Sequence, residues 1–277
     1  TSQRRRRMTG GGMTNDSRLP AKKSLGQNFC TDARLPAEIV RRLAPEPGDA
    51  IWEIGPGPGA LTGSLIETGA GVTAFEIDER MRDELARFGT ALTVHWGDVL
   101  EMDLAPLVPQ GKRLLVTGNL PYYCGTPIMR RLMMLRPPPA RLVFLLQDEV
   151  ARKAAARPGS DLYGFLSAQI RLFAEPVLGT RFSPASFRPS PKVYSTILEL
   201  RPLVLTDEEY ARREDALKLL SVMLSSRRKM ALPLLRHAFP RAVPGWEERF
   251  TSLGIDLKAR GETIPLETVI DLAARPL

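Results

Sequence analysis

Asn119 and the three residues that follow it, Leu120, Pro121 and Tyr122, form the stretch of this sequence best suited to hold an exocyclic amine. They come directly after a short apolar run, residues 113–118, which is typical of a buried strand in a parallel sheet. Ligands of open α/β sheets bind at the carboxyl ends of such strands. The amide oxygen of Asn119 accepts hydrogen bonds, proline has no N–H to donate, and Tyr122 offers a ring on which a base stacks. The tetrad predicts a site for an amino-substituted base; the alternative is an ordinary Asn-Pro turn with a core tyrosine.

A second candidate site is a glycine-rich turn between a strand, residues 50–54, and the helix after it. Gly55 and Gly57 let the backbone pass close to a ligand, and a helix start offers free N–H groups. Glu76 ends the next strand, residues 71–76, about 20 residues past the first glycine, which is the spacing of a carboxylate that binds ribose hydroxyls. The pattern indicates a nucleoside ligand, and a dehydrogenase dinucleotide fits it as well as another nucleoside cofactor does.

Two more residues have the right chemistry for a base. Asp98 follows the third strand, residues 92–96, where it would accept from an adenine amine; the alternative is a solvated turn aspartate. Phe187 lies in a loop stiffened by prolines, residues 187–192, where stacking on a base is expected, with Lys192 contacting the adjacent phosphates. A Phe187 ring covered by other side chains is the alternative.

The elements that must position these residues alternate between strand and helix. This alternation predicts a doubly wound α/β domain. Asp32 is the expected N-cap of a helix that reaches Leu43, and Thr126-Pro127 the expected start of a helix that reaches Leu135. Another helix begins within residues 163–167. The remaining predicted strands lie at residues 113–118, 141–147, 175–182 and 193–200.

The chain after Arg201-Pro202 contains helical patterns and no strand pattern. Thr206 and Glu209 form a capping box, which begins a helix with an apolar stripe. Three consecutive cations follow, Arg227, Arg228 and Lys229, which we place on a helix as phosphate contacts; a solvated face is the alternative. We therefore predict a small helical domain over residues 202–277, after a larger domain over residues 21–201.

Composition narrows the class of protein. The chain has 277 residues, 43% of them hydrophobic, and no apolar run long enough to span a bilayer or serve as a signal peptide, so a cytoplasmic location without membrane contact is expected. Two cysteines, Cys30 and Cys124, are too few for a disulfide framework or a zinc site, so no metal is expected.

The net charge of +8 favours a polyanionic partner. Residues 1–20 hold five arginines against one aspartate, a net +4, so residues 21–277 also carry +4. This first segment has almost no apolar residues and is expected to be a flexible basic tail.

The sequence resembles the KsgA/RsmA family of ribosomal RNA adenine dimethyltransferases from about Lys22 to the carboxyl terminus. Cys30 stands where the family usually has leucine, and Cys124-Gly125 where it usually has Ile-Ser. The motifs that carry the resemblance, in the family's order, are Lys23 to Phe29, Glu53 to Gly57, Glu76 to Asp78, Gly97-Asp98, Gly118 to Tyr122, Gln147 to Ala151, Tyr163 to Ser167, Phe187 to Val193 and Arg227 to Lys229.

The resemblance implies a class I methyltransferase fold that uses S-adenosylmethionine, with a mostly parallel seven-stranded sheet and a helical domain that docks on the immature small ribosomal subunit. The substrate it implies is the N6 amines of two adjacent adenosines in a hairpin loop near the 3′ end of small-subunit rRNA. Glu76 would bind the ribose hydroxyls and Asp98 the adenine amine. A monomer is expected. The positions that match the family's cofactor contacts are Asn28, Cys30, Gly55, Gly57, Glu76, Asp98 and Asn119.

Methyl transfer to adenine N6 agrees with the chemistry of the tetrad. The lone pair of an aromatic amine is delocalised into the ring, and acceptors at Asn119 and the Leu120 carbonyl would favour a pyramidal nitrogen, so the rate would come from positioning and electrostatics. Three alternatives remain: a dehydrogenase, a ribosome assembly factor without catalysis, and the related large-subunit rRNA methyltransferase that confers macrolide resistance.

Overall fold

A seven-stranded sheet forms the centre of the protein. The structure is a computed structural model, and it describes residues 27–121, 124–226, 229–242 and 245–274, so the predicted tail over residues 1–20 lies outside the described residues. The strands of the sheet are β2 (Ala50–Ile54), β3 (Gly71–Glu76), β4 (Leu92–Trp96), β5 (Leu114–Asn119), β6 (Arg141–Gln147), β7 (Ala174–Phe182) and β9 (Ser195–Pro202).

The strand order is β4-β3-β2-β5-β6-β9-β7. Strands β2 to β6 pair in parallel, whereas β9 is antiparallel to both of its neighbours, β6 and β7. The predicted mostly parallel seven-stranded sheet is therefore confirmed. The order in which strands are added to the sheet reverses between β2 and β5, which are parallel neighbours. Ligands of such sheets bind in the crevice at the carboxyl ends of the strands, at this switch point.

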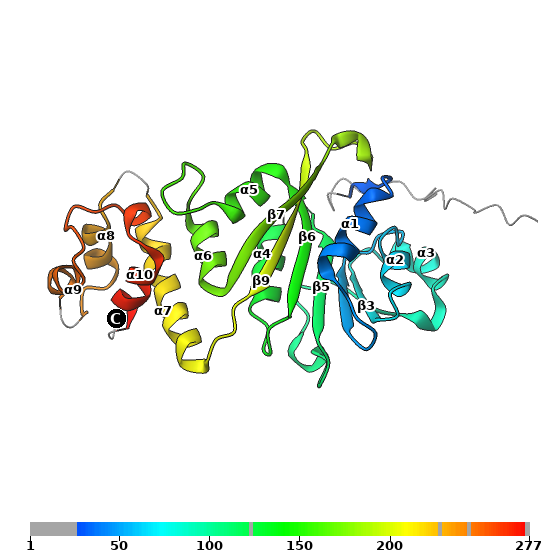
Figure 1. Cartoon of the computed structure of the whole chain (residues 1–277), viewed down its shortest axis with the longest axis horizontal. Coiled ribbons are helices and arrows are strands. Elements are labelled where there is room, and N and C mark those ends of the chain that lie inside the picture. Colours follow the sequence, from blue (N-terminus) through cyan, green and yellow to red (C-terminus); the bar gives the residue numbers. More distant parts are fainter. Residues whose placement is uncertain (1–26, 122–123, 227–228, 243–244, 275–277) are drawn as a thin grey trace, which may run out of the picture.

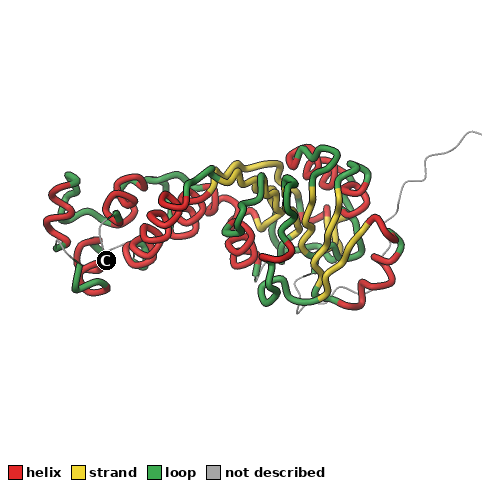
Figure 2. The backbone as a smooth tube through the Cα atoms, turned by 90° about the horizontal axis from the view of Figure 1, so that it is seen from below, coloured by secondary structure: helices red, strands yellow, loops and turns green. Residues whose placement is uncertain are grey.

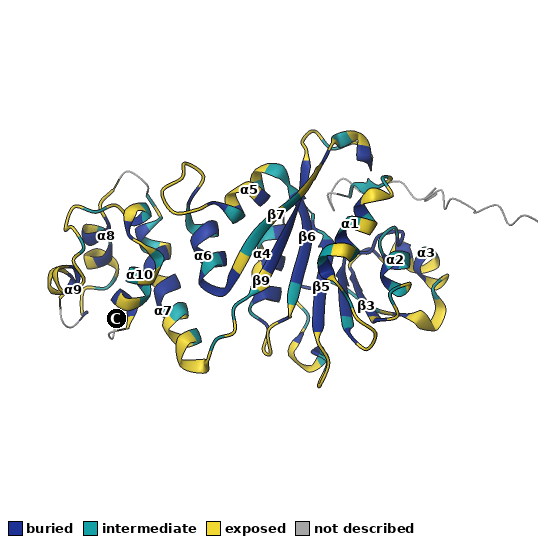
Figure 3. Ribbon diagram, viewed as in Figure 1, coloured by how far each residue is buried: buried dark blue, intermediate teal, exposed yellow. Residues whose placement is uncertain are grey.

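Helices cover both faces of the sheet, as Figure 1 shows. Side chains alternate along each strand, so Ile51 packs with one set of helices and its neighbour Trp52 with the other. Figure 3 shows the central strands β5, β6 and β9 as mostly buried and the outward turns of the helices as exposed. The first face carries α1 (Arg34–Leu43), α2 (Thr62–Ile66) and α3 (Arg82–Ala86), and the second carries α4 (Gly125–Met133), α5 (Asp148–Ala155) and α6 (Phe165–Phe173).

The starts of α1 and α4 test the N-cap residues predicted from the sequence. The prediction that Asp32 is the N-cap of α1 is wrong by one residue, because the N-cap is Ala33. The Asp32 carboxylate still accepts the Arg34 N–H at 3.1 Å, at the start of the helix. The prediction that Thr126 caps α4 is wrong, because the N-cap is Cys124. The Pro121 carbonyl accepts the N–H groups of Cys124 and Gly125, which starts the turn before Thr126.

A pair of two-residue strands, β1 (Phe29–Cys30) and β8 (Phe187–Arg188), lies outside the main sheet. They pair antiparallel, with Cys30 opposite Phe187. This pairing holds the segment before α1 against the loop between β7 and β9.

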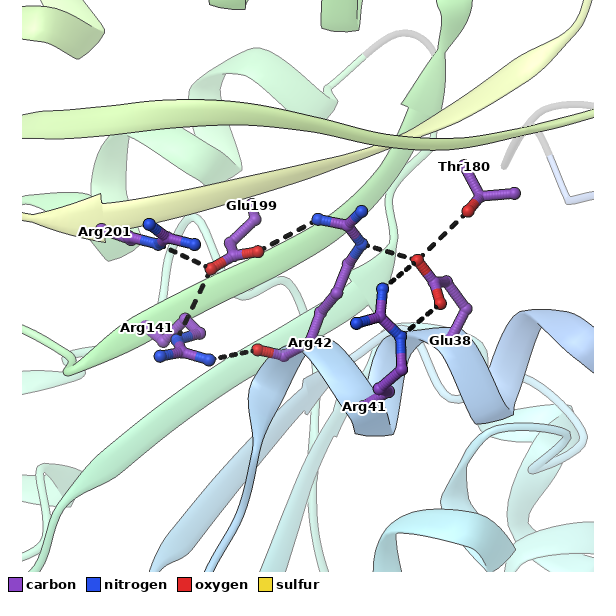
Figure 4. Close-up of polar contacts among 7 residues, drawn as sticks. All are labelled: Glu38, Arg41, Arg42, Arg141, Thr180, Glu199 and Arg201. Carbon is purple, nitrogen blue, oxygen red and sulfur yellow. Dashed lines mark hydrogen bonds and ion pairs between the residues drawn. The ribbon is translucent and has the colours of Figure 1, made fainter.

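An ion-pair network fixes α1 to the antiparallel part of the sheet (Figure 4). The Arg42 side chain lies between Glu38, at 2.8 Å, and Glu199 of β9, at 3.1 Å. Arg201 contacts the same Glu199 carboxylate at 2.8 Å. A β-carbon at Gly179 would come within 2.8 Å of the Arg42 guanidinium, so the glycine leaves room for it. Because α1 directly follows β1, this network also positions Asn28 to Cys30.

The last helices lie at one end of an elongated molecule (Figure 2). A capping box between Thr206 and Glu209 begins α7, as predicted. Leu217 and Leu220 of α7 belong to the same hydrophobic cluster as Phe173 of α6, so the core continues from the sheet into these helices. The helices are α7 (Asp207–Met223), α8 (Ala231–Ala238), α9 (Trp246–Ser252) and α10 (Leu266–Ala273), and short 3-10 turns span Glu79–Met81, Gly89–Ala91, Ala105–Leu107, Pro184–Ser186 and Gly261–Thr263.

Of the three cations predicted to lie on a helix after α7, Lys229 is described by the structure, and its expected placement is corrected. The helix ends at Met223, and Lys229 lies in a bend before α8, since Leu224 already leaves helical geometry. Arg227 and Arg228 lie outside the described residues. Within the described ranges, no helix is both long and apolar enough to cross a membrane.

Candidate active site

A pocket opens at the carboxyl ends of β2, β3 and β5. The segment before α1 forms its opposite wall. Eight residues predicted for the site line this pocket: Asn28, Cys30, Gly55, Gly57, Glu76, Asn119, Leu120 and Pro121. The structure therefore brings the glycine turn and the Asn119 stretch into one cavity, although Gly55 and Asn119 are 64 residues apart in the sequence.

Gly57 is the tightest point of the glycine turn. Its φ of +55° lies in the left-handed region, and a β-carbon would lie 3.1 Å from the Phe29 ring. Its N–H donates to Glu76 Oε2 at 2.9 Å. A side chain at this position would disturb both the turn and the wall of the pocket.

The Glu76 carboxylate lies at the end of β3, with only 3% of the residue exposed. Its second oxygen accepts the Asp78 N–H at 2.8 Å. Burial raises the pKa of this carboxyl, and hydrogen bonds from the backbone N–H groups of Asp78, Gly57 and Ile77 oppose that rise. A carboxylate has about four acceptor sites, so Glu76 can still accept a ribose hydroxyl.

Glu53 also lines the pocket, although no role was predicted for it. It is 2% exposed and accepts a hydrogen bond from the Thr62 hydroxyl at 2.7 Å. Burial raises its pKa to about 8, so the carboxyl holds its proton at neutral pH. The signal in the sequence was an acid inside an otherwise apolar strand, directly before the glycine turn.

Asn119 ends β5, and its side chain crosses the pocket. Its Nδ2 donates to the backbone oxygen of Asn28 at 2.9 Å, and this acceptor identifies which end of the amide is nitrogen. With Nδ2 bonded in this way, Oδ1 is the atom that can accept from a ligand. Pro121 cannot serve as a second acceptor in the same manner, because its carbonyl already accepts two N–H groups. Tyr122 lies outside the described residues.

The approach of β5 to β2 is closest at Gly118. A β-carbon there would lie 2.5 Å from the Ile54 carbonyl oxygen, far inside contact distance. The two residues are register partners at the carboxyl ends of their strands. Only glycine permits this spacing, which places Asn119 beside the glycine turn.

The segment before α1 is held at both ends of the pocket. Gln27 Nε2 donates to Asp78 Oδ2 at 2.9 Å, next to Glu76, while Asn28 accepts from Asn119. Burial raises the pKa of the Cys30 thiol to about 11. The thiol is therefore protonated at neutral pH and a poor nucleophile.

Three predicted residues lie apart from the pocket lining. Asp98 is half-buried beyond β4, and its Oδ1 accepts the Leu100 N–H at 2.8 Å. Phe187 is 2% exposed and packs within the core of the α1 face, so the expectation of an open stacking ring is corrected. Pairing with Cys30 in β1 covers it. Lys192 is exposed on the loop after β8.

The fold and the pocket define a class I methyltransferase that uses S-adenosylmethionine. A dehydrogenase sheet has the order 3-2-1-4-5-6, whereas this sheet has an antiparallel strand, β9, inserted before its edge strand. The pocket also suits a sulfonium nucleoside, with a buried carboxylate for the ribose and a neutral thiol that does not compete for the methyl group. Within the described residues, no cluster of side chains is suited to hold a metal ion.

Comparison with known proteins identifies the family. The model of the family described as ribosomal RNA adenine dimethylase matches residues 18–226. A protein of Phenylobacterium zucineum named ribosomal RNA small subunit methyltransferase A is 38% identical over 262 residues, which cover 92% of this chain and 88% of the relative. A protein of the same name from Cupriavidus metallidurans is 35% identical, with 91% and 92% covered. The chain belongs to the ribosomal RNA adenine dimethylase family, as the resemblance predicted.

Solved structures agree on the fold. A dimethyladenosine transferase from Plasmodium falciparum superposes with a TM-score of 0.73 at 23% identity, covering 88% of this chain and 95% of that one. The 23S rRNA methyltransferase ErmE superposes with a TM-score of 0.65 at 24% identity, covering 89% and 98%.

Proposed function

We propose that this protein transfers methyl groups from S-adenosylmethionine to the N6 amines of two adjacent adenosines in a hairpin loop near the 3′ end of small-subunit rRNA. The substrate is the immature small ribosomal subunit, and the enzyme acts as a cytoplasmic monomer in ribosome biogenesis. One observation carries the proposal: Asn119 lies in the same pocket as Glu76, with its Nδ2 bonded to Asn28. The names of the curated relatives support the small subunit over the large one.

Each residue of the pocket has a part in the proposed reaction. When bound, S-adenosylmethionine supplies an electrophilic methyl group. The Glu76 carboxylate binds the ribose hydroxyls and so fixes the cofactor beside Asn119. Asn119 Oδ1 accepts an N–H of the adenine amine, which favours a pyramidal nitrogen whose lone pair is free to attack. The proton of the methylated amine leaves to water, so no buried base is required.

We also propose a division of labour along the chain. Residues 21–201 form the methyltransferase domain, and residues 202–277 the part that docks on the subunit. Arg227, Arg228, Lys229 and Lys192 bind RNA phosphates. The net charge of +8 supports a polyanionic partner, and the exposed positions of Lys192 and Lys229 allow contact with one.

The test is methylation of ribosomal particles lacking the modification. The protein is incubated with labelled S-adenosylmethionine and with unmethylated small subunits or large subunits, and the modified bases are mapped. We expect N6,N6-dimethyladenosine at two adjacent positions of small-subunit rRNA only. Label in large-subunit rRNA would support the macrolide-resistance type of enzyme instead. Subunit binding without any methylation would support an assembly factor.

A further inference from the structure

Tyr194 and Arg181 form an exposed pair, outside the lining of the active-site pocket, that no step of the proposed reaction uses. The Arg181 guanidinium lies 3.7 Å from the centre of the Tyr194 ring. Tyr194 is 43% exposed, and the preceding Val193 is 42% exposed. An aromatic ring that lies on a cation and is still largely open to solvent is suited to stack a further planar group.

Asp148 holds both members of the pair in place. Arg181 Nε lies 3.4 Å from Asp148 Oδ1, which also accepts the Thr196 hydroxyl at 2.7 Å. The Asp148 N–H donates to the Tyr194 carbonyl at 2.9 Å. One aspartate at the start of α5 therefore fixes both the cation and the backbone of the aromatic residue. Little conformational entropy is lost when a ligand stacks on groups that are already ordered.

The sheet register places the pair close to the target site but not within it. Asn119 is opposite Leu145 in β6, and Asp148 follows three residues later, opposite Tyr194. Two strand spacings and three residues correspond to about 14 Å between Asn119 and Tyr194. A base on Tyr194 would therefore belong to a neighbour of the target nucleotide.

The charge of the surrounding loop favours a nucleic acid. Residues 181–194 contain Arg181, Arg188 and Lys192 and no acidic residue. Arg188 and Lys192 are exposed, and the loop lies at the same end of the sheet as the start of α1 (Figure 1). A hollow that Arg181 lines is also lined by Arg34 and Arg41, but these two arginines are paired with Asp32 and Glu38 and add little uncompensated charge.

We propose that Tyr194, supported by Arg181, is a stacking site for an unpaired nucleotide that flanks the target adenosines, with Lys192 contacting the adjacent phosphate. This inference rests on the proposed function, because it names a contact with the same RNA substrate. It explains how a second base is held while the first is extruded from its loop, since sequence-tolerant stacking can fix a strand without reading it.

The test compares Tyr194→Ala with Tyr194→Phe and with Leu178→Ala, which removes another exposed apolar side chain, also 43% exposed, from β7. The KM for unmethylated small subunits, kcat and the affinity for S-adenosylmethionine are measured for each. We expect Tyr194→Ala to raise the KM by roughly fivefold to a hundredfold, the range of one lost base stack, with kcat and cofactor affinity unchanged. Tyr194→Phe and Leu178→Ala should retain the parent KM.

A photo-crosslinking phenylalanine analogue at position 194 gives an independent readout. The crosslink is expected on a nucleotide next to the dimethylated pair. An unchanged KM for Tyr194→Ala, or a crosslink to the target base itself, would overturn this inference while leaving the proposed function intact. If the parent protein methylated no rRNA, the proposed function would fail, and a KM could not be measured for any variant.

Discussion

The side-chain nitrogen of Asn119 and the backbone oxygen of Asn28, 91 residues apart in the chain, are joined by a hydrogen bond of 2.9 Å. This bond orients the Asn119 amide before a substrate arrives. It also couples the end of β5 to the segment that closes the cofactor side of the pocket. A reaction whose rate depends on geometry benefits from an acceptor fixed in this way.

Asn119→Ala should lower the single-turnover rate of methylation by about a hundredfold to a thousandfold, because the oxygen that stabilises the pyramidal amine is lost. Asn119→Asp keeps acceptor oxygens but loses the donor to Asn28, so its rate should also fall, from misorientation. Rates are measured with saturating cofactor and subunits, and melting temperatures serve as the control for folding. A near-parental rate for Asn119→Ala would show that this stretch is only a turn.

Glu76→Gln should weaken S-adenosylmethionine binding by roughly tenfold to a hundredfold, since hydrogen bonds to a charged acceptor contribute about 1.5–3 kcal/mol. Titration calorimetry measures the affinity directly. Glu79→Gln, three residues away with a side chain that is 71% exposed, is the matched control and should bind as the parent does. Equal affinities for all three proteins would remove Glu76 from the cofactor site.

Glu53→Gln should make the stability of the ligand-free protein less dependent on pH. The folded protein holds the Glu53 proton up to about pH 8, whereas the unfolded chain releases it near its ordinary pKa of 4.5, so this group's stabilising contribution is lost as pH rises between these values. The parent's free energy of unfolding, relative to that of the variant, should fall by about 3–4 kcal/mol from pH 5 to pH 8. Urea unfolding at both pH values measures it. Parallel pH profiles would mean that Glu53 is ionised in the folded protein.

Arg42→Met should lower the free energy of unfolding by about 2–4 kcal/mol, because it removes one partner of the buried Glu199 carboxylate. Arg41→Met is the matched control on the same helix. The Arg41 side chain is 65% exposed, so its contact with Glu38 should contribute no more than about 1 kcal/mol. Equal losses for the two variants in urea unfolding would mean that the Arg42 bridge has no special role.

Replacing Arg227, Arg228 and Lys229 together with glutamate should weaken binding to small subunits and flatten its dependence on salt. Each lost phosphate contact should reduce the slope of log affinity against log salt by roughly 0.7–0.9. Cofactor affinity should stay at the parent value. A salt slope equal to that of the parent would identify these cations as a solvated face.

Local patterns in the sequence predicted the strands and the spacing of the pocket residues well. The predictions of a strand over residues 50–54 and of a strand-end carboxylate at Glu76 rest on strand–helix alternation and turn chemistry, which are local to one βαβ unit. The burial of Phe187 could not be predicted in this way, since it follows from pairing with Cys30 far earlier in the chain. The Arg42–Glu199 ion pair joins residues 157 positions apart, so local patterns could not predict it either.

Gly118 determines how far the two ligands of the proposed enzyme are from each other, although it is placed to touch neither of them. Because Gly118 has no side chain, β5 can approach the Ile54 carbonyl of β2. The glycine turn follows β2, and Asn119 ends β5. Gly118→Ala would act as a wedge that lengthens the gap the methyl group must cross. Such an enzyme would bind both cofactor and RNA but transfer the methyl group slowly. The alanine side chain at position 118 would then control the rate of the reaction without contacting either ligand.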